Sequence, residues 1–224
     1  MRSRTLRLVD LELVYRQRFS GIDSSARRVV WDEITRYLER RFGVPNRLLD
    51  VACGSGEFIT ASTSAEKWAL DSMPGLDVDP QIRFKQGEYL SMDLPEKYFD
   101  MIFMSNILEH LDSREHVSQF LARAFQQLEQ AGHLVVLGPN FRYTMKQYFD
   151  FADHNIIITH KSMVEFLIGA GFVPKTIIPR FLPYSFRSRR AILPGARYLT
   201  RLYLRFPPLW HLMGRQFLIV AIKP

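Results

Sequence analysis

A short apolar segment that runs directly into a glycine-rich turn constrains the fold of this chain most strongly. Residues 47–51 are followed by Ala52-Cys53-Gly54-Ser55-Gly56, and a helix is expected from Glu57. A strand, a tight turn and a helix start place backbone N–H groups where a ligand can lie close. Glycines at 54 and 56 remove the Cβ atoms that would obstruct it. This unit predicts an α/β fold with a ligand at the turn.

The rest of the chain alternates strands and helices, which favours crossover connections and a parallel sheet. The edge strand is expected at 172–178, because Pro174 cannot donate to a sheet ladder. The apolar run 217–222 is typical of a strand that is buried on both faces. The other expected elements are strands at 68–71, 82–85, 100–105 and 133–137, a helix at 24–42, a helix that includes 117–128 and ends at Gly132, and a helix opened by a capping box of Ser162 and Glu165.

Residues 181–213, between the last two strands, form an insertion with an unusual composition. It contains six arginines, several aromatic residues and no acid. The net charge is +5 over residues 1–47, −8 over 48–153 and +10 over 154–224. Arginine mixed with aromatic residues suits an anionic membrane surface or a diphosphate carrier, and RNA binding uses the same residue types. A lid with solvated arginines remains the alternative; we favour a lid that contacts substrate, with membrane association second.

The acids beside the glycine turn discriminate between cofactors. Asp50 precedes the turn by two residues, and Asp71 ends the next strand, where it can accept from two ribose hydroxyls. A dinucleotide fingerprint needs a third glycine, but Ile59 occupies that position. A carboxylate at Asp50 repels a pyrophosphate and holds an ammonium group. These charges favour S-adenosylmethionine over a nicotinamide dinucleotide.

The segment 48–56 resembles the first motif of class I S-adenosylmethionine-dependent methyltransferases, with Ala52 in place of the usual first glycine. Segments 99–102 and 106–111 are similar to the family's fourth strand and the helix after it. The resemblance implies a Rossmann-like, doubly wound seven-stranded sheet, mostly parallel with an antiparallel last strand. It divides the chain into an N-terminal helical cap at 1–46 and a methyltransferase domain at 47–224.

The same resemblance implies a set of cofactor contacts that extends from the methionine end to the adenine. The residues concerned are Asp50, Ala52, Gly54, Ser55 and Gly56 at the methionine end, Asp71 and Ser72 at the ribose, Glu88 and Tyr89 at the adenine, and Ser105 and Asn106 at the sulfonium.

A hydroxyl acceptor needs a base to take its proton as it attacks the methyl group. Asp153 and His154 follow the fifth strand, and we expect His154 as the base with the Asp153 carboxylate behind it. A loop role for both residues remains open. His160 is expected in the first turn of the next helix, and the expected substrate-binding residues are His110, Tyr148 and Asp150.

Two substrate classes and a metal are disfavoured. The residues after the fourth strand are Ser105-Asn106-Ile107, unlike the run used on exocyclic base amines. Methylation of a pyrimidine carbon usually needs a cysteine nucleophile, and the single cysteine, Cys53, lies in the cofactor turn. The pair Glu109-His110 is similar to part of a metal site in a few quinone-pathway and RNA-end methyltransferases. Those enzymes have another acid three residues earlier, where this chain has Asn106, so we expect no metal.

A closer resemblance concerns bacterial methyltransferases found with surface-polysaccharide assembly. The segments that carry it include 15–19, 148–154, 181–184 and 214–217. It implies O-methylation of a sugar or a lipid-linked glycan. A nucleic-acid methyltransferase and a non-catalytic module that binds the cofactor or a partner remain alternatives. With no apolar signal-peptide core and no spanning segment in the sequence, we expect a cytoplasmic protein, peripheral to the inner membrane at most.

Overall fold

A computed structural model describes residue 13 and residues 24–73, 79–184 and 195–224. These residues form a seven-stranded sheet of order β3-β2-β1-β4-β5-β7-β6, in which β7 runs antiparallel to both of its neighbours and the other pairs are parallel. The strands are β1 (Arg47–Val51), β2 (Glu66–Asp71), β3 (Arg83–Gln86), β4 (Phe99–Ser105), β5 (Leu128–Pro139), β6 (Val173–Leu182) and β7 (Gln216–Ile222). The predicted Rossmann-like architecture is confirmed, including Pro174 in an edge strand.

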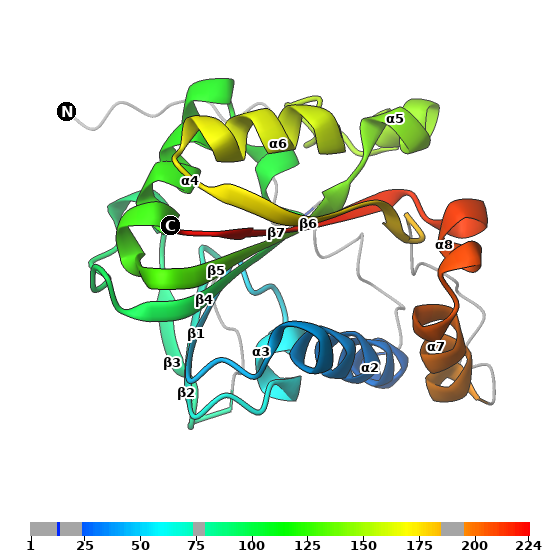
Figure 1. Ribbon diagram of the computed structural model, residues 1–224, viewed down its shortest axis with the longest axis horizontal. Coiled ribbons are helices and arrows are strands. Elements are labelled where there is room, and N and C mark those ends of the chain that lie inside the picture. Colours follow the sequence, from blue (N-terminus) through cyan, green and yellow to red (C-terminus); the bar gives the residue numbers. More distant parts are fainter. Residues whose placement is uncertain (1–12, 14–23, 74–78, 185–194) are drawn as a thin grey trace.

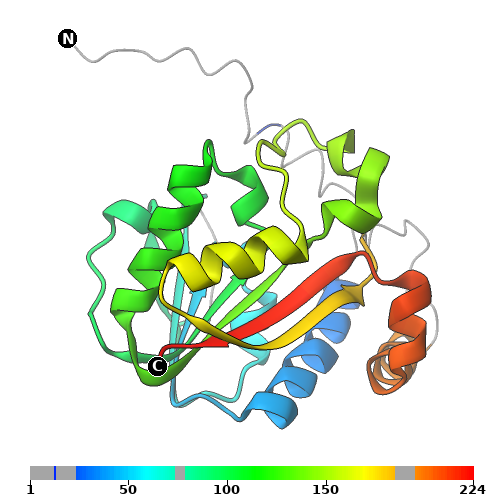
Figure 2. The same ribbon diagram turned by 45° about the horizontal axis from the view of Figure 1, so that its top comes forward.

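Helices cover both faces of the sheet (Figure 1). The α4 and α6 helices lie on one face, α2 and α3 on the other, and α7 and α8 lie together at one end in both ribbon views (Figures 1 and 2). The α-helices are α2 (Ser24–Phe42), α3 (Glu57–Ala61), α4 (Arg114–Gln127), α5 (Phe141–Thr144), α6 (His160–Gly169), α7 (Ala196–Arg205) and α8 (Pro207–Met213). The short 3₁₀ helices are η1 (Tyr89–Ser91), η2 (Leu108–His110) and η3 (Met145–Asp150).

The core has two halves, because successive residues of a strand point to opposite faces. In β5, Leu134 and Val136 pack on the side of α4 and α6, whereas Val135 and Leu137 pack on the side of α2. On that second side, α2 contributes the buried residue Ile34. The helix has the predicted bounds, residues 24–42, and it covers one face of the sheet. The proposed boundary between 1–46 and 47–224 stays a prediction.

Two predicted helix boundaries are wrong. The α4 helix ends at Gln127, and Gly132 lies inside β5, where an added Cβ would be 3.0 Å from the carbonyl oxygen of Glu129. Close packing, and not a helix end, accounts for this glycine. The α6 helix is capped by Thr159, whose hydroxyl accepts from the Ser162 amide at 3.1 Å while Ser162 Oγ accepts from the Thr159 amide at 2.9 Å. Ser162 is thus the third helical residue of the capping box and not its first member.

The insertion leaves and re-enters the sheet at the carboxyl ends of the parallel strands, the same side of the sheet as the glycine turn. Leu182 pairs with Gln216, and Gln216 pairs with Pro139 at the carboxyl end of β5. The described part of 181–213 folds into α7 and α8, while residues 185–194 lie outside the described part of the chain. None of the described helices combines the length and the apolar character that a membrane crossing requires.

Candidate functional site

The glycine turn lies at the carboxyl end of β1 and has a left-handed backbone at three residues. The φ angles are 57° at Ala52, 56° at Gly54 and 73° at Gly56. Glycine adopts this conformation without a steric penalty, but Ala52 carries a Cβ and is strained by about 1 kcal/mol. The amide of Cys53 donates to the Leu70 carbonyl at 3.0 Å and joins the turn to β2. The departure from glycine at residue 52 therefore adds strain but preserves the turn.

Asp71 fixes the shape of this turn. One carboxylate oxygen accepts from the Gly54 amide at 2.8 Å, and the other accepts from the Met73 amide at 2.8 Å. The side chain is buried at 7% exposure. Each carboxylate oxygen has a further lone pair, so the predicted ribose contact is compatible with these bonds and stays a prediction. The sequence did not reveal that Asp71 also holds the turn.

Asp50 supplies a buried carboxyl group at the carboxyl end of β1. Its side chain is 2% exposed, and its Oδ2 atom has no hydrogen-bond partner in the described part of the chain. Burial raises the pKa of Asp50 well above its usual value, and the Asp71 and Glu57 carboxylates raise it further. A cationic ligand would relieve this repulsion and satisfy the orphaned oxygen. The site thus fits the ammonium group of S-adenosylmethionine and does not fit a pyrophosphate.

Two neighbours of the turn complete its surroundings. Glu57, the first residue of α3, pairs with Arg27 of α2 through Oε1 and Nε at 3.0 Å. Cys53 is buried, and burial followed by the nearby Asp50 charge raises the pKa of its thiol. A protonated, buried thiol is a poor nucleophile. Of the other predicted cofactor contacts, Ser55 at the methionine end and Ser72 at the ribose are exposed, and Gly56 is buried.

The predicted adenine contacts follow β3. The Gly87 amide donates to the Asp71 carbonyl at 2.9 Å, which places the exposed residue Glu88 directly beyond the end of β2. The Tyr89 side chain is buried, and its hydroxyl donates to Gln127 Oε1 at 2.7 Å. Only the backbone of Tyr89 can face a ligand, as the resemblance implies.

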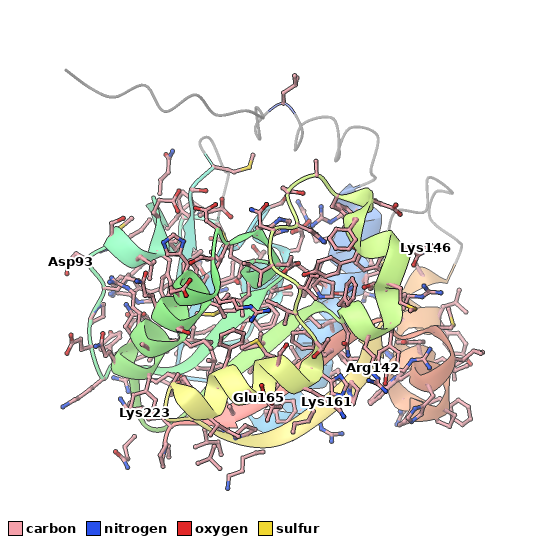
Figure 3. The ribbon with its side chains drawn as sticks, turned by 90° about the horizontal axis from the view of Figure 1, so that it is seen from above. Asp93, Arg142, Lys146, Lys161, Glu165 and Lys223 are labelled. Atoms are coloured by element: carbon pink, nitrogen blue, oxygen red, sulfur yellow. The ribbon has the colours of Figure 1, made fainter. Side chains whose placement is uncertain are left out.

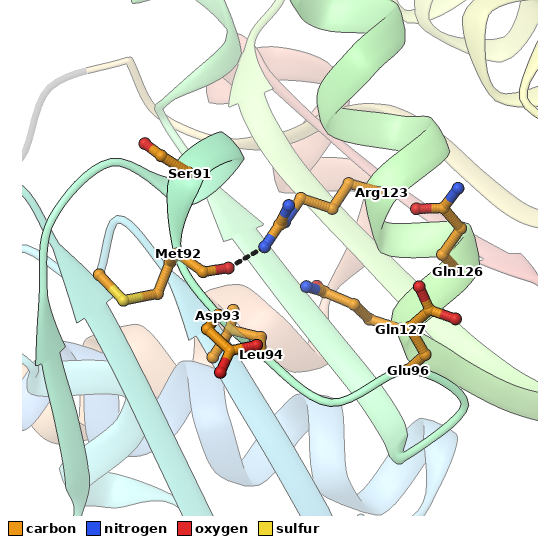
Figure 4. A pocket seen from close by; sticks show the side chains of 8 residues that line it. All are labelled: Ser91, Met92, Asp93, Leu94, Glu96, Arg123, Gln126 and Gln127. Carbon is orange, nitrogen blue, oxygen red and sulfur yellow. Dashed lines mark hydrogen bonds between the residues drawn. The ribbon is translucent and has the colours of Figure 1, made fainter.

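Arg123 of α4 holds the segment that carries these adenine contacts. Its guanidinium donates to the Met92 carbonyl (Figure 4). It also donates to the Leu90 carbonyl at 2.9 Å and lies over the Tyr89 ring. The same arginine borders a pocket of about 360 Å³. Its lining residues are Ser91, Met92, Asp93, Leu94, Glu96, Arg123, Gln126 and Gln127. None of the predicted site residues lines this pocket, so the site and the pocket are distinct.

Ser105 ends β4, the strand beside β1, and Asn106 follows it. Asn106 has a left-handed backbone with φ of 52°, and its amide donates to the Leu137 carbonyl at 2.9 Å. Its side-chain amide donates to Ser105 Oγ at 2.9 Å. Asparagine tolerates this conformation better than most residues. The two polar groups are thus presented together at the edge where the methyl group is expected.

Two histidines form a cluster: His110 is the last residue of η2, and His154 lies in the loop after η3. His110 Nδ1 lies 2.9 Å from the carbonyl oxygen and 3.2 Å from the carboxylate Oδ2 of Asp153. The His110 and His154 ring centroids are 4.8 Å apart. Burial lowers the pKa of His110, but the Asp153 hydrogen bond and the charges of Glu109 and Asp153 outweigh it, so the pKa is raised above 6.5.

The structure corrects the expected histidine–carboxylate pair. The Asp153 carboxylate was expected behind His154, but it pairs with His110 Nδ1. The expectation that His154 is the base stays a prediction. The backbone explains the exchange, because the amides of Asn155 and Ile156 both donate to the Glu109 carbonyl, at 2.9 and 3.1 Å. These bonds dock the loop onto η2 and bring Asp153 against His110. The two residues are 43 positions apart in sequence, so no local pattern could reveal this pairing.

The other predicted acceptor contacts differ in accessibility. Tyr148 is fully buried, its hydroxyl donates to the Ile156 carbonyl, and its ring contacts His154 at 4.6 Å between centroids. Tyr148 therefore supports the loop, and the structure does not place its hydroxyl toward an acceptor. The Phe151 ring stacks on His154, with 4.8 Å between the ring centroids. Asp150 is exposed at the end of η3.

Glu109, His110 and His154 together could coordinate a metal ion. One potential ligand atom from each lies within 4.8 Å of the others. Glu109 is 3% exposed, and burial raises the pKa of its carboxyl group. The expectation that the site uses no metal was based on Asn106 alone and stays a prediction. Sequence reasoning treated Glu109 and His110 apart from His154, because the contact depends on the loop fold.

His160 lies outside this cluster. It is the first residue of α6, as predicted, and its Nδ1 atom is 2.9 Å from Asn140 Nδ2. Burial lowers the pKa of His160, and the positive charges of Arg142 and Lys161 lower it further. Arg142 belongs to α5 and Lys161 to α6, and both residues are labelled in Figure 3. His160 is thus disfavoured as a cation and bonds to Asn140 within the fold.

Comparison with known proteins extends over most of the chain. A family model described as a methyltransferase domain matches residues 22–174. The curated 27-O-demethylrifamycin SV methyltransferase of Amycolatopsis mediterranei (strain S699) is 28% identical over 109 residues, which are 42% of this chain and 39% of that protein. The match therefore spans well under half of the length of this curated relative.

Solved structures share the fold at low sequence identity. A SAM-dependent methyltransferase from Archaeoglobus fulgidus superposes with a TM-score of 0.62 at 18% identity, covering 96% of this chain and 100% of that one. An S-adenosylmethionine-dependent methyltransferase from Mesorhizobium loti gives a TM-score of 0.60 at 16% identity, with 86% and 98% coverage. With the family match and the acidic glycine turn, these findings show that the chain belongs to the methyltransferase domain family and is a class I S-adenosylmethionine-dependent methyltransferase.

Proposed function

We propose that this enzyme methylates a hydroxyl group of a sugar, on a glycan or a lipid-linked acceptor, and that His110 takes the hydroxyl proton. The supporting observation is that Asp153 pairs with His110, which follows Ser105 and Asn106 closely in the chain. The curated relative acts, by its name, on a 27-O-demethyl acceptor, which supports an oxygen nucleophile. The resemblance to surface-polysaccharide methyltransferases supports a sugar.

In the proposed reaction, each residue has a defined role. S-adenosylmethionine supplies an electrophilic methyl group on a positively charged sulfur. The acceptor oxygen forms a bond to the methyl carbon as the carbon–sulfur bond breaks, and S-adenosylhomocysteine leaves. Asp153 accepts from the protonated His110 Nδ1, so Nε2 is the nitrogen that receives the hydroxyl proton. His154, between Tyr148 and Phe151, forms the adjoining wall of the site. In line positioning of the reacting atoms supplies the rest of the rate.

The substitution His110→Asn tests this assignment. The Asn side chain retains a donor near Nδ1 but has no base at the Nε2 position. We expect S-adenosylhomocysteine formation with a lipid-linked sugar acceptor to fall by about 10²- to 10⁴-fold, with unchanged S-adenosylmethionine affinity. The matched control is His116→Asn on α4, where the histidine side chain is 42% exposed, and for it we expect wild-type turnover.

The pH profile separates a base from a structural residue. Because the pKa of His110 is raised, the proton-bound form persists above pH 6.5 and the rate should rise with pH through that range. The substitution Asp153→Asn removes the carboxylate and should move this rise to lower pH. A rise at the same pH in both proteins, or a His110→Asn enzyme with full turnover, would contradict the role of His110.

A further inference from the structure

The helices of the insertion present an apolar surface that nothing in the described structure covers. On α7, exposures are 69% for Tyr198, 47% for Leu199 and 47% for Leu202. Phe206, directly after the helix, is 52% exposed. With 3.6 residues per turn, these four side chains fall within about a third of the helix circumference. On α8, which lies next to α7 (Figure 1), Leu212 is 75% and Met213 48% exposed.

The opposite side of α7 is firmly attached to the protein. Arg201 binds the buried Glu33 of α2 through two nitrogens, at 2.8 and 3.0 Å, and Arg197 binds Asp32 at 3.2 Å. Leu204 is 4% exposed, and the Tyr203 hydroxyl donates to the Phe181 carbonyl at 2.7 Å. These contacts fix which side of α7 faces outward. The exposed apolar strip is therefore a defined surface of the fold.

The charge of this region is one-sided. Residues 181–213 contain six arginines and no acid. Arg197 and Arg201 are neutralised by α2, but Arg205 beside the apolar strip forms no ion pair with any described residue. Arg187, Arg189 and Arg190 add positive charge to the same connection and lie outside the described residues. An apolar strip flanked by arginine suits an anionic bilayer surface.

The main competing occupant is a second copy of the chain. A two-fold interface would place the same patch of each copy against the other. Arg205 of one copy would then face the apolar strip and Arg205 of the other, and residues 181–213 contain no acid that could pair with it. A bilayer with anionic headgroups offers opposite charge and accepts the apolar side chains. Charge complementarity therefore favours lipid over a dimer.

We propose that Tyr198, Leu199, Leu202, Phe206, Leu212 and Met213, with Arg205, form a surface that docks on anionic lipid bilayers. The insertion leaves the sheet at Leu182 and returns at Gln216, at the edge that carries Asp50 and His110. Docking would thus bring the reaction edge near the bilayer, where a lipid-linked acceptor resides. The link between this surface and a lipid-linked acceptor rests on the proposed function, whereas the binding of the surface to lipid does not.

Vesicle flotation tests the proposal without turnover. The full chain is mixed with phosphatidylcholine vesicles that contain either no anionic lipid or 30% phosphatidylglycerol. We expect flotation with the anionic vesicles only, weakened by salt. The double substitution Leu202→Ser with Leu212→Ser should reduce the partition at least about tenfold. Arg205→Gln should reduce it about fivefold, since one arginine near an anionic surface contributes about 1 kcal/mol.

The matched control replaces two equally exposed apolar residues elsewhere, Val44→Ser with Ile168→Ser, at 54% and 59% exposure. It should float like the wild type, and all variants should retain S-adenosylmethionine binding as evidence of folding. Absent flotation, or equal losses in both double variants, would overturn the proposal. A wild-type dimer in sedimentation equilibrium that dissociates only in the Leu202→Ser with Leu212→Ser variant would also overturn it. The same holds for binding of single-stranded RNA that is lost in that variant alone. Flotation without methylation of any sugar would contradict only the proposed function.

Discussion

The substitution Asp50→Asn is expected to weaken S-adenosylmethionine binding by about 10- to 100-fold while it stabilises the unliganded protein at high pH. The loss follows because a buried charge-assisted hydrogen bond to the ammonium group is removed. The gain follows because the buried carboxylate has no compensating cation in the unliganded site and is repelled by Asp71 and Glu57. The same charge that binds the ligand thus destabilises the empty site.

The direction of the pH dependence follows from the raised pKa. Below the unfolded value of 3.8, Asp50 is protonated in both states and has no charge to bury. As pH rises toward the higher pKa of the folded protein, folding must increasingly take up a proton, and stability is lost at about 1.4 kcal/mol per pH unit. Asp50→Asn lacks this loss, so its stability relative to wild type should increase with pH.

Thermal unfolding between pH 4 and 8, with and without S-adenosylmethionine, measures both effects. We expect the difference in Tm between variant and wild type to move in favour of the variant as pH rises. We also expect the ligand to stabilise the wild type far more than the variant. A difference in Tm that does not change with pH would show that the Asp50 carboxylate does not destabilise the folded protein. Equal stabilisation of both proteins by the ligand would show that Asp50 does not bind it.

The substitution Gly214→Ala is expected to have the largest effect on stability. An added Cβ would lie 2.6 Å from the carbonyl carbon of Arg180 and 2.6 Å from the carbonyl oxygen of Trp210. Both are backbone atoms, so neither can move aside by a side-chain rotation. The φ of −67° at Gly214 suits any residue, and the cost is therefore steric alone. Overpacking of this kind costs about 3 kcal/mol, or about 6–12 °C in Tm for a chain of this size.

Gly169→Ala is the matched control, because an added Cβ there meets nothing within 4 Å. We expect its stability to stay within about 0.5 kcal/mol of wild type in chemical denaturation. An equally stable Gly214→Ala protein would mean that α8 is not packed against β6 as described. That result would also weaken the membrane proposal, which depends on the fixed orientation of α7 and α8.

Local sequence patterns were sufficient to predict the sheet and the cofactor turn. The turn is short, and its glycines and acids act through backbone geometry and charge, which the residue types themselves determine. Helix limits were less certain, because Thr159 and Ser162 both cap helices well and only packing selects between them. Gly132 resembles a helix end in sequence, although close backbone contacts in β5 are what require it.

The histidine cluster could be predicted only in part. His110, Asp153 and His154 were all identified as polar residues that follow strands, which is where sites form in such sheets. Their pairing depends on the bonds from Asn155 and Ile156 to the Glu109 carbonyl, and these join segments that are far apart in sequence. The outward side of α7 was equally hidden, because it is set by the ion pairs of Arg197 and Arg201 with α2.

Calorimetric titration of the wild-type protein with S-adenosylmethionine, S-adenosylhomocysteine and NAD tests the charge argument at the glycine turn most directly. We expect one-to-one binding of the first two ligands, which both carry an ammonium group for Asp50, and no heat from NAD, whose pyrophosphate Asp50 repels. Binding of NAD, or a folded protein that binds neither adenosyl ligand, would contradict this account of the site.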